Sequence, residues 1–277
     1  MKTIISKNIG FCSGVERAIL MAEESIKKDK RPIQFLGSIV HNEEVINKFK
    51  KLKVKFIKDI KKAKPGTLII QAHGIPPLKF KLDNKIIIKD ATCPLVKRVQ
   101  LISKKLLEQG YQVIIIGDKK HSETRGIKGY AKNKAIIIEN EIEAEKIPDF
   151  KKIGVIAQTT QSLENVNLIL KVLKKHSKNI KYINTICPEV KIRQKELKTI
   201  SKKTDGILIM GSKTSANTKR LVNIAKKTKK PFFFVNTYKE LNRKKLSKIK
   251  ILGIASGAST PNWEIKETIQ WLNRKQK

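Results

Sequence analysis

The sequence is poor in acidic residues, aromatic residues and cysteine. Asp and Glu number 24 against 61 Lys and Arg, for a formal net charge of +37, and aromatic residues make up 5% of the 277 positions. The three cysteines are an odd number and lie far apart, so we expect reduced thiols of a cytoplasmic protein rather than a disulfide framework. No apolar run approaches the ~20 residues that span a bilayer, and the N-terminal residues do not resemble a signal peptide. A membrane protein is therefore not expected.

Several cofactor signatures are also missing. The chain has no C-x-x-C zinc pair and no ferredoxin-type run of cysteines, so a metal would need ligands from distant segments. It has neither a Walker P-loop nor a G-x-G-x-x-G sequence, so a nucleotide cofactor is not indicated. The functional residues must therefore be ones that the fold brings together.

The positive charge makes nucleic acid the first partner to consider. The lysines, however, occur along the whole chain rather than in one tail or beside exposed aromatic residues. We interpret them as a solvated lysine-rich surface that would attract an acidic protein, and we do not expect specific nucleic-acid binding. A basic nucleic-acid-binding protein with structural cysteines is the alternative, and its binding would weaken steeply with salt.

Each cysteine opens the same short pattern. A valine stands three residues after the cysteine, a charged residue follows the valine, and a stretch with helical spacing comes next. An apolar run then ends in a glycine that lies 25, 24 or 24 residues after the cysteine. This interval fits one helix followed by one strand, and it recurs three times. The three pairs are Cys12 with Gly37, Cys93 with Gly117, and Cys187 with Gly211.

The repeat predicts an α/β fold made of three small modules. A second apolar run follows each first one, and runs rich in Ile and Val that alternate with helices are typical of parallel sheets covered on both faces. Length alone favours about two domains, whereas the repeat divides the chain into residues 1–92, 93–186 and 187–277. We predict that the modules are related by pseudo-threefold symmetry, with their parallel sheets around a central cavity.

Polar side chains follow the predicted strands and define a candidate binding site. In parallel sheets, the residues beyond the carboxyl ends of the strands form the ligand crevice. The hydrogen-bond donors lie on loops that lead into helices, where phosphate groups usually bind, so we predict an anionic ligand. Glu123 is a carboxylate among these donors and is the candidate to carry a proton. The predicted donors are His41, His73, His121, Ser215, Asn217 and Ser259.

The cysteines are candidate metal ligands. Proline follows Cys93 and Cys187 directly, which suits the first position of a helix and places both sulfurs at helix N-termini, where the dipole favours a thiolate. Three thiolates, with Cys12 as the third, fit either a zinc ion completed by a histidine or a four-iron cluster in which one iron has no protein ligand. Both alternatives stay open on spacing, and the lack of a fourth cysteine favours the cluster.

The motifs around these residues resemble those of the LytB family of 4-hydroxy-3-methylbut-2-enyl diphosphate reductases. They occur in order over nearly the whole chain as GFCSGVERAI, HNEEVI, AHGIPP, DATCPLV, HSETRG, AQTTQS, NTICPEVKIRQ, GSKTSANTKRL and SGASTPNW. The resemblance implies a trefoil of three α/β modules around a [4Fe-4S] cluster that is held by Cys12, Cys93 and Cys187. It also implies the last step of non-mevalonate isoprenoid synthesis, in which two electrons and protons remove the substrate's hydroxyl as water and give isopentenyl and dimethylallyl diphosphates.

The resemblance further implies roles for individual side chains. Glu123 would relay protons and Thr159 would help to orient the hydroxyl end of the substrate, while His121 would belong to both the catalytic and the diphosphate-binding sets. A ferredoxin or flavodoxin would supply the electrons, in agreement with the basic surface. The diphosphate would be held by His41, His73, His121, Ser215, Asn217 and Ser259.

The chain departs from the family pattern at four positions. Ala216 stands where a second serine is usual, so one side-chain donor to the diphosphate is missing. Glu189 and Val190 replace an alanine and a threonine after the third cysteine, which leaves the roles of both positions open. Ser122 replaces a frequent proline, which would loosen that loop without altering its chemistry. A family member that keeps the fold but has lost turnover is therefore a further alternative.

Overall fold

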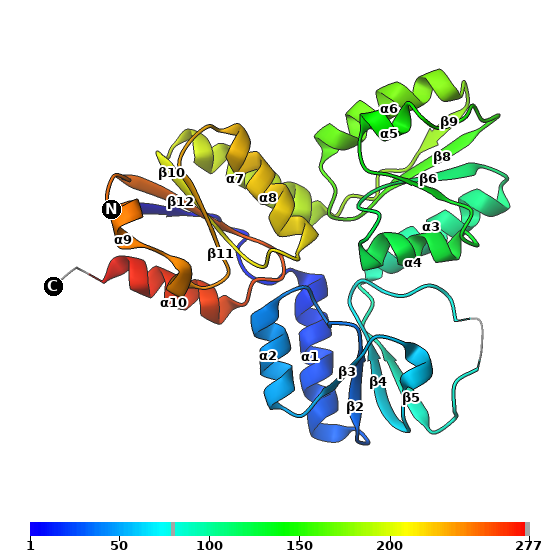
Figure 1. The fold of residues 1–277 in the computed structure, drawn as a ribbon, viewed down its shortest axis with the longest axis horizontal. Coiled ribbons are helices and arrows are strands. Elements are labelled where there is room, and N and C mark those ends of the chain that lie inside the picture. Colours follow the sequence, from blue (N-terminus) through cyan, green and yellow to red (C-terminus); the bar gives the residue numbers. More distant parts are fainter. Residues whose placement is uncertain (79–80, 275–277) are drawn as a thin grey trace. The chain divides into compact units, whose positions relative to one another are not determined.

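The structure is a computed structural model that describes residues 1–78 and 81–274. It contains three four-stranded sheets in which every strand pairing is parallel (Figure 1). The chain forms two compact units. The first comprises Met1–Val15, His41–Lys48 and Pro188–Lys277, and the second comprises Glu16–Val40 and Phe49–Cys187. The predicted α/β class with parallel sheets is confirmed.

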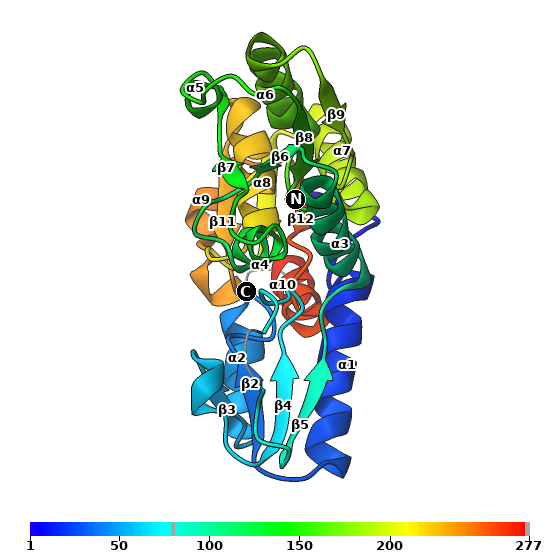
Figure 2. The same cartoon turned by 90° about the vertical axis from the view of Figure 1, so that its right-hand side faces the viewer.

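The second unit holds two of the sheets. One has the strand order β3-β2-β4-β5 and the other has the order β7-β6-β8-β9. Figure 2 shows β4 and β5 of the first of these as neighbouring parallel arrows. Its strands are β2 (Ile33–Leu36), β3 (Lys55–Ile57), β4 (Gly66–Ile70) and β5 (Ile86–Asp90). The other sheet consists of β6 (Gln112–Ile116), β7 (Ile136–Ile138), β8 (Ile153–Ala157) and β9 (Ile180–Tyr182).

Helices cover both faces of the β6–β9 sheet (Figure 1). On one face α3 (Pro94–Glu108) and α4 (Ser122–Tyr130) enclose a core that includes Val113 and Ile115 of β6. On the other face lie α5 (Glu141–Ala144) and α6 (Leu163–His176), in agreement with the buried residues Ile114 and Ile116 that alternate with the first pair. The run QVIII is therefore apolar on both sides because both sides are covered.

Three other helices lie in the N-terminal part of the chain. They are α1 (Ser13–Lys28), α2 (Glu43–Lys51) and a 3-10 helix (Ile60–Lys62). Phe35 of β2 is fully buried and packs edge-to-face on Phe49 and Phe56, with ring centroids 5.1 and 5.3 Å away. Aromatic residues are scarce in this chain, and three of them are concentrated in this small core.

The first unit holds the third sheet, with the order β1-β12-β10-β11. Ile207 and Ile209 of β10 face α7 and α8, whereas Leu208 and Met210 belong to the core on the opposite face with α9 and α10. Its strands are β1 (Lys2–Ile5), β10 (Gly206–Met210), β11 (Phe232–Val235) and β12 (Ile251–Ser256). The helices are α7 (Pro188–Lys202), α8 (Ala216–Lys227), a 3-10 helix (Tyr238–Glu240), α9 (Arg243–Leu246) and α10 (Asn262–Asn273).

The three sheets share one topology. In each of them the strand that precedes a cysteine in the sequence is an edge strand. This edge strand pairs with the second strand of a repeat: β5 with β4, β9 with β8 and β1 with β12. The predicted module 1–92 includes residues 2–5, but β1 pairs with β12 at the other end of the chain, with Lys2 opposite Ile251. The N-terminal strand thus completes the sheet of the C-terminal segment. The division into three domains stays a prediction.

Two strand ends require glycine. Gly37 and Gly211 directly follow β2 and β10 and have φ values of 75° and 141°, a region that side chains rarely adopt. A Cβ at Gly37 would lie 2.9 Å from Gln71 Oε1, and one at Gly211 would lie 2.8 Å from Thr218 Oγ1. Glycine therefore lets the chain leave each strand and pass closely beside the side chains of Gln71 and Thr218.

Within residues 1–78 and 81–274, none of the helices combines the length and the apolar character that crossing a bilayer demands.

Candidate active site

The three cysteines occupy equivalent positions relative to the three sheets. Each is half-buried and directly precedes the first residue of a helix, namely α1, α3 or α7. Each backbone N–H donates to a carbonyl in the loop after the second strand of the repeat. The three N···O pairs are Cys12 to Ala258 at 3.0 Å, Cys93 to Ala72 at 2.9 Å and Cys187 to Thr159 at 2.9 Å. The sequence repeat thus corresponds to one repeated backbone contact.

This donor set fits an iron–sulfur or zinc centre. Thiolate sulfur is the ligand that iron–sulfur clusters and zinc both prefer. The three half-buried cysteines can each supply one such ligand. Cys93 and Cys187 belong to the second unit and Cys12 to the first. The convergence of the three sulfurs on one metal centre stays a prediction.

Glu123 and Thr159 meet in the second unit. Glu123 is the second residue of α4 and is only 1% exposed. Its carboxylate accepts hydrogen bonds from the Thr159 backbone N–H at 2.6 Å and from Thr159 Oγ1 at 3.0 Å. Burial raises the pKa of Glu123 to about 7, although the hydrogen bonds from Thr159 oppose the shift. A carboxyl group with this pKa can both hold and release a proton near neutral pH.

His121 caps the same helix. Its side chain occupies the N-cap of α4, where Nδ1 accepts a hydrogen bond from the backbone N–H of Glu123 at 3.2 Å. An accepting Nδ1 carries no proton, so a neutral His121 carries its proton on Nε2 and presents a donor there. The ring of His73 lies edge-on to that of His121, with centroids 5.1 Å apart. The loops after β4 and β6 therefore bring two of the predicted donors side by side.

In the first unit, the loop after β12 meets the segment before α2. Ser259 Oγ donates to the backbone carbonyl of His41 at 3.1 Å, which joins two predicted donors that lie 218 positions apart. Burial lowers the pKa of His41, with Lys219 adding to the effect and Glu43 opposing it. His41 is thus held in its neutral form, in which one ring nitrogen donates and the other accepts.

Asn217 carries the clearest sign of a missing ligand. Ser215 is the N-cap of α8, and its Oγ accepts from the Thr218 N–H at 3.3 Å. Asn217, in the first turn of that helix, is only 3% exposed, and neither its Oδ1 nor its Nδ2 has a hydrogen-bond partner in the described part of the chain. A buried amide in this state costs free energy that a polar ligand would offset. The N-terminus of α8 is a suitable place for an anion.

The structure accounts for two of the departures from the family pattern. The carboxylate of Glu189, at the start of α7, accepts hydrogen bonds from the backbone N–H of Ser13 at 3.2 Å and from Ser13 Oγ. Glu189 therefore ties the helix that follows Cys187 to the residue after Cys12. Val190 is buried in the core, where a threonine hydroxyl would need a partner.

The sequence patterns do not single out the side chains that hold the His121 loop from within. Gln158 is fully buried, and its Oε1 accepts from the Asp118 N–H at 2.8 Å. Thr124 Oγ1 donates to the His121 carbonyl at 2.8 Å. Both residues lie inside quoted motifs, AQTTQS and HSETRG, but only their contacts reveal that they position the loop.

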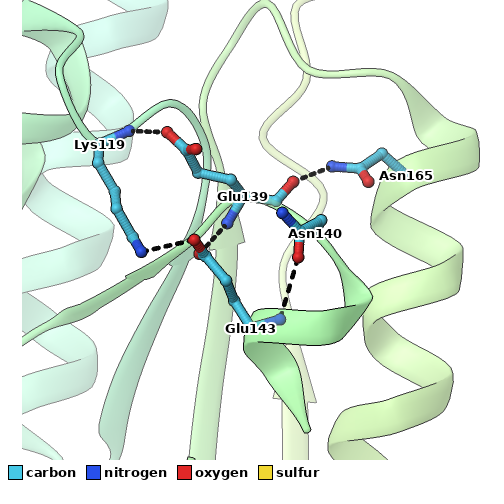
Figure 3. A network of polar contacts seen from close by, with 5 residues as sticks. All are labelled: Lys119, Glu139, Asn140, Glu143 and Asn165. Carbon is cyan, nitrogen blue, oxygen red and sulfur yellow. Dashed lines mark hydrogen bonds and ion pairs between the residues drawn. The ribbon is translucent and has the colours of Figure 1, made fainter. Parts of the chain in front are cut away.

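A second network holds the outer side of the same loop (Figure 3). The Lys119 backbone N–H donates to Glu139 Oε1 at 2.6 Å, and Lys119 Nζ forms an ion pair with Glu143 at 2.6 Å. Asn140 caps the N-terminus of α5 through the Glu143 N–H, and Asn165 donates to the Glu139 carbonyl at 2.9 Å. The loops after β6 and β7 are thereby fastened to α5 and α6, which fixes the approach to His121.

Comparisons with known proteins agree over nearly the whole chain. The family described as LytB protein matches residues 3–273. A 4-hydroxy-3-methylbut-2-enyl diphosphate reductase of Geobacter metallireducens is 36% identical over 98% of this chain and 96% of that protein. One of Clostridium perfringens is 39% identical, with 96% of both chains covered.

Solved structures are similar as well. The structure described as the E-1-hydroxy-2-methyl-but-2-enyl-4-diphosphate reductase from Plasmodium falciparum superposes with a TM-score of 0.91 at 33% identity, over 99% of this chain and 88% of that one. A second, described as (E)-4-hydroxy-3-methyl-but-2-enyl diphosphate reductase, the terminal enzyme of the non-mevalonate pathway, gives 0.71 at 35% identity, over 98% and 99%. Parallel sheets whose cysteines directly precede helices define the class, and the chain belongs to the LytB protein family.

Proposed function

We propose that the chain is a 4-hydroxy-3-methylbut-2-enyl diphosphate reductase, the terminal enzyme of the non-mevalonate pathway. Its substrate would lose the hydroxyl group by reductive dehydroxylation to isopentenyl and dimethylallyl diphosphates. Two electrons and two protons enter, the carbon–oxygen bond breaks, one proton goes to carbon, and the other leaves in water with the oxygen. The names and full-length similarity of the relatives support this activity.

The observation that carries the proposal is the buried contact between Glu123 and Thr159. Reductive dehydroxylation needs a proton donor in a site from which bulk water is excluded, and Glu123 is buried with a pKa of about 7. Thr159 Oγ1 donates a hydrogen bond to the Glu123 carboxylate at 3.0 Å. This hydrogen bond orients the Thr159 hydroxyl, which can in turn orient a substrate hydroxyl beside it. His121 shares the same helix start and supports the Glu123 backbone.

The diphosphate would bind to the predicted hydrogen-bond donors and to helix N-termini. Asn217 gains the hydrogen-bond partners that its buried amide lacks among the described residues, and Ser215 already marks the anion-binding end of α8. His41, His73, His121 and Ser259 complete the proposed set. Ala216 offers no side-chain donor, so its backbone N–H or water takes the place of the usual serine.

Cys12, Cys93 and Cys187 would hold a [4Fe-4S] cluster, which, when bound, supplies the electrons at the carbon–oxygen bond. Each of the three cysteines directly precedes a helix, and their sulfur atoms are the ligands that iron–sulfur clusters require. The chain carries neither a Walker P-loop nor a G-x-G-x-x-G sequence, and the electrons would come from another protein. A ferredoxin or flavodoxin suits the net charge of +37.

The proposal is tested with protein that is purified without air. We expect a brown protein that contains iron and sulfide and that reduces the diphosphate substrate with dithionite and methyl viologen. A colourless protein with one zinc ion would contradict it. An iron-loaded protein that binds substrate without turnover would instead identify a family member that has lost its activity.

The nucleic-acid alternative predicts different results. If Cys93→Ser left the chain's function intact while added salt abolished it, the cysteines would be structural and the basic surface functional. We expect the reverse, namely that Cys93→Ser abolishes reduction of the substrate.

A further inference from the structure

The outer side of α3 is an exposed apolar strip with a basic border, which we call the α3 face. Leu101 lies at its centre and is 56% exposed. The residues line a shallow hollow of about 390 Å³, and they share one side of the helix because they recur at intervals of three and four positions. The α3 face consists of Pro94, Lys97, Arg98, Leu101, Ile102 and Lys105.

All the charges next to Leu101 are positive. On the helix surface, the neighbours of a residue lie three and four positions away. For Leu101 these are Lys97 and Arg98 on one side and Lys104 and Lys105 on the other. An apolar centre between four cations would therefore meet a partner that carries acidic residues around an apolar patch.

The chain itself neutralises only part of this charge. Lys97 Nζ forms an ion pair with Asp90 at 3.0 Å, and Lys104 Nζ forms one with Glu108 at 3.8 Å. Arg98 and Lys105, in contrast, form no ion pair with any residue of 1–78 or 81–274, and both are exposed. Their charge is available to a partner.

The other two helices that follow a cysteine lack this combination. Each has one large exposed apolar residue: Leu20 on α1 lies eight positions after its cysteine, as Leu101 does, and Ile192 on α7 lies five positions after Cys187. The neighbours of Leu20 are Glu16, Arg17, Glu23 and Glu24. The neighbours of Ile192 are Pro188, Glu189, Lys195 and Glu196. Both surroundings contain more acidic than basic residues, so an acidic partner would be repelled there.

The α3 face also has a fixed relation to Cys93. Cys93 is the N-cap of α3, and Pro94, its neighbour, is already part of the face. At 1.5 Å per residue, Leu101 lies only ~12 Å along the helix axis from Cys93. Val99 and Leu106 on the inner side of α3 are buried against the β6–β9 sheet, so the face is held rigidly relative to the cysteine.

We infer that the α3 face is the docking surface of an acidic one-electron carrier protein. The inference rests on the proposed function, which needs two electrons per turnover from a donor outside the chain. The carrier is oxidised by one electron at each of two encounters, and the electrons pass through the centre proposed at Cys93. A small apolar contact with a charged rim suits such a partner, because electron-transfer complexes are transient and small.

The test compares two charge-reversal variants of the anaerobically purified chain. The first is Arg98→Glu with Lys105→Glu on the α3 face. The matched control is Lys171→Glu with Lys174→Glu on α6, which changes the net charge equally and also borders a shallow hollow, but on a helix that no cysteine precedes. An acidic ferredoxin is the probe. Its Kd is measured by calorimetry, and substrate reduction is driven either by the reduced ferredoxin or by dithionite and methyl viologen.

We expect the α3 variant to bind ferredoxin about tenfold more weakly and to lose ferredoxin-driven activity in proportion, since opposite charges steer and orient such encounters. Its viologen-driven activity and iron content should equal those of the parent chain, and the α6 control should change little. Equal losses in both variants, or none in either, would overturn the inference. So would a loss of duplex DNA binding in the α3 variant with the ferredoxin-driven rate unchanged. A parent chain without viologen-driven activity would refute the proposed function itself.

Discussion

Glu123→Gln is expected to stop proton transfer while it leaves the fold and the iron content intact. Gln has nearly the same shape, and its carbonyl oxygen can still accept the hydrogen bond from the Thr159 N–H. It cannot deliver a proton, so we expect kcat for the viologen-driven reaction to fall by about 10²–10⁴-fold. Substrate binding should change much less.

The same substitution has a consequence for stability that does not depend on any ligand. Burial raises the pKa of Glu123 to about 7 from its ordinary value of 4.5. Between these pH values the unfolded chain has lost the proton and the folded chain keeps it, so the free energy of unfolding falls as pH rises through this window. The difference in pKa corresponds to about 3 kcal/mol, which the parent chain has lost above pH ~7.

Urea unfolding of the parent chain and of Glu123→Gln from pH 4.5 to 8 measures this effect. The variant has no group to ionise at this position, so its unfolding free energy should fall less with pH, and the gap to the parent should reach up to about 3 kcal/mol. Glu141→Gln is the matched control, because Glu141 is exposed on α5. Parallel pH profiles for the parent and Glu123→Gln, together with unchanged kcat, would refute the assignment of Glu123 as a buried proton carrier.

Three further substitutions test other contacts. Asn217→Ala removes a buried amide that has no hydrogen-bond partner among the described residues. We expect the free energy of unfolding of the ligand-free chain in urea to rise by about 1 kcal/mol and KM for the diphosphate substrate to rise as well. A loss of stability would contradict this. Glu189→Ala removes the acceptor of the hydrogen bonds from Ser13 and should lower the free energy of unfolding by about 1 kcal/mol, and an unchanged urea midpoint would show that the contact is unimportant. Gly211→Ala places a side chain at a φ of 141° and should lower the melting temperature through a loss of about 1–3 kcal/mol, which an unchanged melting temperature would disprove.

Much of the fold follows from short-range patterns in the sequence. The start of α3 follows from Pro94 directly after Cys93, and the ends of β2 and β10 follow from Gly37 and Gly211. The parallel sheets follow from apolar strands that lack alternation, as in β10. These features depend on neighbours along the chain, which a single sequence displays.

Contacts between distant segments could not be predicted in this way. β1 pairs with β12 across almost the whole chain, and KTII contains nothing that specifies its partner. The contact between Glu123 and Thr159 spans 36 positions, and the one between Glu189 and Ser13 spans 176. Glu123 could be selected as a carboxylate among donors, but its burial and its raised pKa depend on packing that only the structure reveals.

The proposed activity depends most on the three cysteines serving one metal centre. Iron and sulfide analysis of anaerobic protein, repeated for the single variants Cys12→Ser, Cys93→Ser and Cys187→Ser, tests this most directly. We predict about four iron atoms and four sulfides per parent chain, with a loss of the cluster's absorbance in every variant, because each cysteine supplies one ligand to the same group. A full complement of iron in any one variant, or zinc in place of iron in the parent, would contradict the account.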